Sequence, residues 1–105
     1  MSKSRANLTY REFQEICAQD SPPEELNPLL TAMWHDFRGN WDTAHSLVQD
    51  VATSDGSWVH AYLHRKEGDQ ANASYWYSRA GKPKPDISLE KEWELITIVL
   101  LDSYQ

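Results

Sequence analysis

The chain has 105 residues, which is the length of one ordinary domain with a single modest hydrophobic core. Its 10 basic and 16 acidic side chains give a formal net charge of −6, which argues against a broad nucleic-acid surface. The only cysteine, Cys17, excludes an internal disulfide and fits a reducing cytoplasm. Because the sequence shows neither a signal-peptide core nor an apolar run of bilayer length, we expect a cytoplasmic protein without membrane contact.

Helical patterns begin after a polar N-terminal stretch, residues 1–8, which we predict to be disordered. The remaining residues, 9–105, are predicted to form a single helical domain. Thr9 is a candidate N-cap of the first helix, with Glu12 completing a capping box. Cys17 falls on the apolar stripe of this helix, so a buried thiol is expected there. The segment Ser21-Pro22-Pro23 ends the helix.

The second helix has two candidate starts, because Pro28 is unfavourable inside a helix. It begins either near Glu24, with an acidic first turn, or after Asn27 as the cap. Gly39 is expected to end it. Asn40 is then expected to cap a third helix over Trp41–Val51.

The central segment predicts two further helices. The polar stretch 53–57, which includes Gly56, is expected to be a loop. The fourth helix is predicted over Ser57–Glu67, followed by a tight turn at Gly68-Asp69. The fifth helix is predicted over Gln70–Ala80.

A stiff proline-containing connector, 81–85, leads to the last helix, for which Ser88 is the candidate cap. The apolar segment Leu95–Leu101 is expected to be helical and buried on several sides, either within the monomer or in a homodimer interface formed by the C-terminal helix. Most Trp and Tyr residues fall on apolar stripes, and we expect Trp58 and Tyr75 to be partly exposed.

One pattern occurs twice. His35–Ala44 reads HDFRGNWDTA, and His64–Ala73 reads HRKEGDQANA, with an offset of 29 residues. Both copies contain a glycine, Gly39 or Gly68, which can take the left-handed conformation that ends a helix. The repeat therefore predicts two helical hairpins in tandem.

These residues resemble tetratricopeptide and Sel1-like repeats between about Leu29 and Pro85. The positions that carry the resemblance are, in the second copy, Ala61, Ala73, Tyr77, Ala80 and Pro85, and in the first copy Ala32, Ala44, Val48 and Val51, with Gly56 where a proline is usual. The offset is shorter than the usual tetratricopeptide period. The segment 58–81 is also similar to a small bacterial family of unassigned function. The repeat resemblance implies a scaffold that binds partners, chiefly peptides.

The predicted fold is therefore all-α, with about six helices. Two tetratricopeptide-like or Sel1-like hairpins form the middle, and the N- and C-terminal helices cover the ends.

The leading functional hypothesis is a cytoplasmic binding or adaptor module that recognises a peptide or a small anionic ligand. The candidate groove is rich in histidine, arginine and tyrosine. Its predicted residues are His60, His64, Arg65, Tyr75 and Arg79, with His35 and His45 as further members. Histidines would donate hydrogen bonds, and the Arg79 guanidinium would hold an anion.

The alternative is a metal-dependent or small-molecule enzyme. His60, His64 and Glu67 follow the spacing i, i+4, i+7, which places them on one flank of a helix. If the third helix packs there, His45 joins them and a divalent metal could be held. No nucleophile–base pair or phosphate-binding glycine loop is found in the sequence, so catalysis is the less favoured role and no cofactor is required.

Overall fold

The computed structural model describes residues 8–104 of the chain. This part contains six α-helices and no strand. The helices are α1 (Tyr10–Cys17), α2 (Pro28–Phe37), α3 (Trp41–Val48), α4 (Ser54–Glu67), α5 (Gln70–Ala80) and α6 (Leu89–Tyr104). The prediction of an all-α fold with about six helices is confirmed. Residues 1–7, most of the stretch expected to be disordered, lie outside the described part, and Leu8 packs partly against the core.

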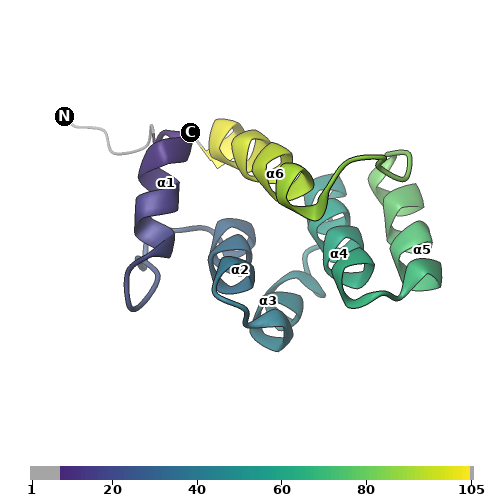
Figure 1. The fold of residues 1–105 in the computed structure, drawn as a ribbon, viewed down its shortest axis with the longest axis horizontal. Helices are drawn as coiled ribbons and strands as arrows, with labels where there is room; N and C mark the ends of the chain where they lie inside the picture. The colour runs from purple at the N-terminus through teal and green to yellow at the C-terminus, as the bar shows by residue number, and fades with distance from the viewer. Residues whose placement is uncertain (1–7, 105) are drawn as a thin grey trace.

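The helices are arranged as two neighbouring pairs with α6 lying across them. α2 packs mainly against α3, and α4 packs mainly against α5. α3 and α2 also contact α4, so the two pairs lie side by side. α6 then runs back over the row and contacts α4, α2 and α1 (Figure 1). In residues 8–104 no helix is both long enough and apolar enough to cross a bilayer.

Both predicted hinges contain a left-handed glycine, as the sequence indicates. Gly39 has φ 83° and Gly68 has φ 92°, a region that favours glycine over any residue with a Cβ. Asp69 then caps α5 by accepting a hydrogen bond from the Asn72 amide at 3.2 Å. Asn40 occupies the N-cap position of α3 as predicted, but the expected hydrogen bond from its side chain to the helix is not formed. Helix α3 is also shorter than predicted and ends at Val48.

The first two helices begin where local capping chemistry places them. The Thr9 side chain accepts from the Glu12 amide at 3.0 Å, and the Glu12 carboxylate accepts from the Thr9 amide at 2.9 Å. This is the predicted capping box. Asn27 accepts from the Leu30 amide at 2.8 Å, so the second of the two candidate starts for this helix is the correct one.

Helix α4 begins earlier than predicted. The segment 53–57, expected to be a loop, forms the start of this helix. Thr53 is the N-cap and accepts a hydrogen bond from the Gly56 amide at 3.0 Å, and the first turn is acidic. Gly56 therefore lies inside a helix. A Cβ built there would lie 2.4 Å from the Val51 carbonyl oxygen, so glycine is required for close packing of the preceding loop.

The core lies between the helix pairs and α6. Cys17 is fully buried, as expected, and burial raises the pKa of its thiol to about 12. Tyr75 is 53% exposed as predicted, but Trp58 is only 8% exposed, because it packs under Lys82 and against α6.

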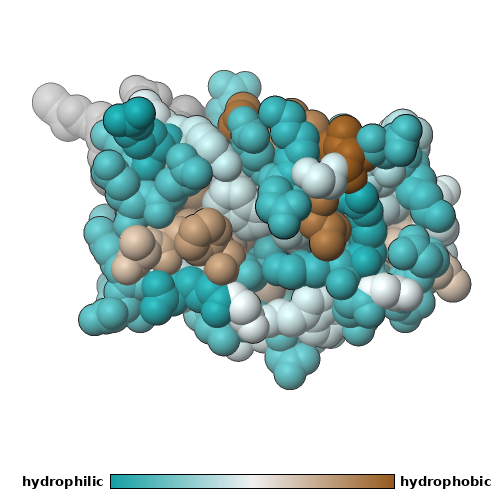
Figure 2. Space-filling view, in the orientation of Figure 1, coloured by the Kyte–Doolittle hydropathy of each residue, from teal (hydrophilic) through white to brown (hydrophobic). Residues whose placement is uncertain are grey.

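Helix α6 buries only part of its apolar surface. Ile96, Leu100 and Leu101 are buried, whereas Leu95, Ile98 and Val99 stay exposed. Figure 2 shows hydrophobic groups among hydrophilic ones in the region of α6. The predicted helix is therefore present, with one of its faces uncovered in the single chain.

Candidate metal centre

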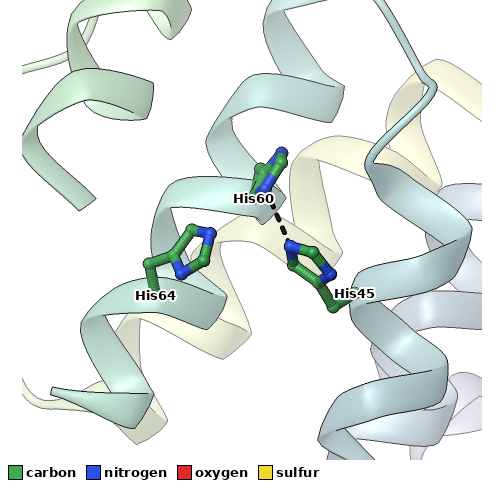
Figure 3. A group of neighbouring side chains, drawn as sticks. All are labelled: His45, His60 and His64. Carbon is green, nitrogen blue, oxygen red and sulfur yellow. Dashed lines mark hydrogen bonds between the residues drawn. The ribbon is translucent and has the colours of Figure 1, made fainter. Parts of the chain in front are cut away.

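Three histidines from two helices meet at the junction between the helix pairs. His60 and His64 lie one turn apart on the same face of α4, and both are nearly buried, with 5% and 8% exposure. Helix α3 packs beside α4 and brings in His45. Its Nε2 lies 3.1 Å from the Nε2 of His60 (Figure 3). One ring nitrogen of each histidine lies within 4.8 Å of the others.

Two tryptophans hold this three-histidine cluster in place. Trp41, one turn before His45 on α3, stacks on the His45 ring with centroids 4.9 Å apart. Its indole Nε1 donates to the Leu63 carbonyl of α4 at 2.7 Å, which fixes α3 against α4. On the other flank, Trp76 of α5 stacks on His60 with centroids 3.9 Å apart. The imidazole planes are therefore set by three helices.

Glu67 orients the third imidazole from outside the cluster. Its Oε1 lies 2.6 Å from Nδ1 of His64, one turn earlier on α4. A carboxylate at that distance accepts the Nδ1 proton, so in the neutral form of the His64 ring Nε2 is the nitrogen with a free lone pair. Metal-bound histidines commonly donate their second nitrogen to a carboxylate in this way. Glu67, predicted as a ligand, thus lies behind the His64 ring.

Burial favours the uncharged form of two of the three histidines. Desolvation, followed by the neighbouring His45 and His64, lowers the pKa of His60 to about 4. Burial, followed by His64, also lowers the pKa of His45, partly opposed by Glu67 and Asp42. At neutral pH His45 and His60 are therefore neutral imidazoles, the form that binds a metal ion.

The spacing of the nitrogens suits a tetrahedral ion. Two imidazole nitrogens bound to the same Zn²⁺ at 2.0–2.1 Å lie about 3.3 Å apart in tetrahedral geometry. Nε2 of His45 and Nε2 of His60 share a hydrogen bond of 3.1 Å, so the pair needs little movement to bind an ion, but the imidazole that donates this bond must shift its proton to Nδ1. Imidazole is a good ligand for Zn²⁺, Cu²⁺, Ni²⁺ and Co²⁺ alike, so the donor set selects a late transition metal over Mg²⁺ or Ca²⁺.

The Asp69 carboxylate, close to the end of α4, already accepts hydrogen bonds within the protein. His64, Glu67 and Asp69 also have potential ligand atoms within 4.8 Å of one another. However, both carboxylate oxygens of Asp69 accept hydrogen bonds from Asn72, one from its amide and one from its side chain. This arrangement caps α5, so we place the candidate centre at the three-histidine cluster.

The other predicted groove residues lie elsewhere. Arg65 points to the opposite face of α4, where it donates to Glu92 at 2.8 Å and to the Ile87 carbonyl. Tyr75 and Arg79 form a pair on the outer face of α5, with the guanidinium 5.8 Å from the Tyr75 ring centroid. His35 packs edge-on against Trp34 of α2. Of the seven residues predicted to line one groove, only His45, His60 and His64 form a common cluster.

The structure adds two members that we did not predict, Trp41 and Trp76. Both were assigned to the core from their helical spacing. A local signal existed for Trp41, because it precedes His45 by one turn and so shares its face. Trp76 gives no such signal, since it reaches His60 only through the packing of α5 on α4.

A separate hollow lies between α1, α2, α4 and α6. Its volume is about 320 Å³, and aromatic side chains of Tyr10, Phe37 and Trp93 line it together with the Asp36–Lys66 ion pair. Phe37 is 53% exposed. This hollow is independent of the histidines.

Comparison of the chain with protein-family models, with curated proteins and with solved structures gave no match.

Proposed function

We propose that this protein is a helical metal-binding domain whose His45, His60 and His64 hold one divalent transition-metal ion, most simply Zn²⁺. The observation that carries the proposal is the approach of Nε2 of His45 to Nε2 of His60 at 3.1 Å, with His64 in reach of both. Three imidazoles from two helices make a donor set typical of zinc sites.

The surroundings of the cluster support this proposal. Glu67 sets the tautomer of His64, and Trp41 and Trp76 stack on the other two rings. A site of this kind needs both ligands of the right type and groups that fix their orientation.

The test is Zn²⁺ titration of the full chain, purified without a histidine tag, by calorimetry at neutral pH. We expect a single ion per chain. His60→Ala should weaken binding by at least about 100-fold, because a lost ligand costs more than a lost outer partner. His35→Ala is the matched control, since it removes a histidine from α2 outside the cluster. Absence of binding by the wild-type chain, or equal binding by both variants, contradicts the proposal.

A second candidate function is the cytoplasmic adaptor role suggested by the repeat resemblance, with a peptide or small anionic ligand. The hollow of about 320 Å³ favours it, because its size and aromatic lining are those of a ligand pocket. Arg79, beside the exposed Tyr75, is the candidate anion clamp. Phe37→Ala should reduce capture of a partner if the hollow binds it, whereas Arg79→Ala or His64→Ala should do so if the predicted groove binds it.

We also propose that two chains can pair through α6. The support is the exposed row of Leu95, Ile98 and Val99, which follows helical spacing along one face. Light scattering in dilute solution tests this pairing. A clean monomer removes it without affecting the metal proposal.

A further inference from the structure

The three-histidine cluster supplies fewer ligands than a tetrahedral ion takes. Zn²⁺ and Co²⁺ in such sites have four ligands, and structural sites obtain all four from protein while catalytic or exchangeable sites obtain three. The cluster contains three nitrogen donors, from His45, His60 and His64. The source of the fourth ligand therefore decides which kind of site this is, an argument that rests on the metal-binding function proposed above.

The nearest carboxylates are poorly placed to be that ligand. Glu67 binds Nδ1 of His64, on the opposite side of the ring from Nε2, and so cannot reach the ion while it holds the ring. The Asp69 carboxylate caps α5. Asp42 lies on the exposed face of α3, one turn before His45. Keeping these residues in their present roles leaves the fourth position to solvent.

Charge and access favour an external ligand as well. Three neutral imidazoles do not compensate the double positive charge of the ion, and a largely desolvated charge needs a partner. Glu67 supplies only one negative charge from behind His64. His45 and Trp41 are partly exposed, unlike His60 and His64, so the cluster meets solvent on its α3 side. Trp76, which stacks on His60 from α5, is partly exposed as well.

We propose that the ion bound by His45, His60 and His64 keeps one exchangeable coordination position, open on the α3 side, which takes water or a small monoanion from solution. The ligand class is a monodentate anion such as azide, thiocyanate or a simple carboxylate. The site would then be of the open type, able to present a bound ligand, in contrast to a closed zinc site that only stabilises the fold.

The experiment uses the full chain loaded with Co²⁺, whose visible absorption reports its ligands, and titrates it with sodium azide. We expect a saturable shift of the visible bands, with Co²⁺ retained on equilibrium dialysis. Sodium perchlorate at the same ionic strength is the control and should cause no shift. His35→Ala should respond like the wild type.

Two failures can be told apart. If Co²⁺ does not bind, or binds His60→Ala equally well, the metal proposal itself fails. If Co²⁺ binds but its spectrum ignores azide and thiocyanate, the site is closed and the present inference is overturned while the metal proposal stands. A response that appears only in Asp42→Asn or Glu67→Gln would also overturn it, because that carboxylate would then be the fourth ligand.

Discussion

Arg65 and Lys66 on one face of α4 each meet a buried carboxylate, whereas His60 and His64 on the other face meet a third imidazole. On the first face, Glu92 accepts from Arg65, Trp58 and Tyr77, at 2.8, 3.2 and 2.6 Å. Asp36 likewise accepts from Tyr62 and Lys66, at 2.8 and 2.9 Å. Every charge in this ionic region is paired, as a structural role requires.

The histidine face follows another logic. Each of its three rings has a nitrogen close to the other two, His45 and His60 share a hydrogen bond, and the negative partner Glu67 lies at the rim. Such an arrangement gains little for the fold by itself, but it is complete once a cation is added. The contrast teaches that burial of polar groups alone does not mark a functional site. What distinguishes the histidine face is that three imidazoles, all of a type that binds metal ions, lie close together.

Glu92→Ala should break the ionic face with the largest effect. The 1% exposed carboxylate holds three donors, and removing it leaves the Arg65 guanidinium without its main partner. We expect a loss of about 3–5 kcal/mol in the free energy of unfolding. Urea denaturation measures it. Glu94→Ala, which removes an exposed pair with Lys91 on the same helix, should cost about 0.5 kcal/mol or less.

Glu67→Gln should affect the histidine face and leave the ionic face intact. The amide cannot hold the Nδ1 proton of His64 as a carboxylate does, so Zn²⁺ affinity should fall about 10- to 100-fold. Competition with a chromogenic chelator measures the change. Asp42→Asn removes the same charge near His45, where burial is the main influence on the pKa. An equal loss in both variants would show that only long-range charge matters.

The smallest expected effect concerns alkaline stability. Burial raises the pKa of both Tyr62 and Tyr77 well above the usual range of a phenol, followed in each case by effects of the neighbouring carboxylate, Asp36 or Glu92. In the unfolded chain both phenols ionise near pH 10. Their contribution is therefore constant below pH 10 and is lost as pH rises above it, by about 1.4 kcal/mol per pH unit for each tyrosine.

Tyr77→Phe should accordingly reduce by about 1.4 kcal/mol per pH unit the slope of unfolding free energy against pH above 10. Denaturation at a series of alkaline pH values provides the measurement. Tyr75→Phe, which alters an exposed phenol, is the control. An unchanged slope for Tyr77→Phe would mean that its hydroxyl reaches solvent at high pH.

Much of the fold follows from local rules. The Thr9 capping box, the Gly39 and Gly68 hinges and the Asp69 cap are set by residues within a few positions of one another. Gly56 was misassigned because glycine serves both turns and close packing, and only the nearby Val51 carbonyl shows which applies.

The candidate site was predictable only in part. His60 and His64 share a face by spacing alone, but the arrival of His45 depends on how α3 packs on α4. Arg65 is predicted in the groove as part of the basic run His64-Arg65-Lys66. Its partner in the structure, Glu92 of α6, is 27 residues away. No local pattern in the sequence predicts that this glutamate is buried.

His45 belongs to the first helix pair, and His60 and His64 belong to the second. An ion bound by all three histidines would link the two helix pairs across their contact. Removal of the ion by a chelator would then separate the two helix pairs before either pair unfolds. Amide hydrogen exchange should therefore become faster first where α3 contacts α4.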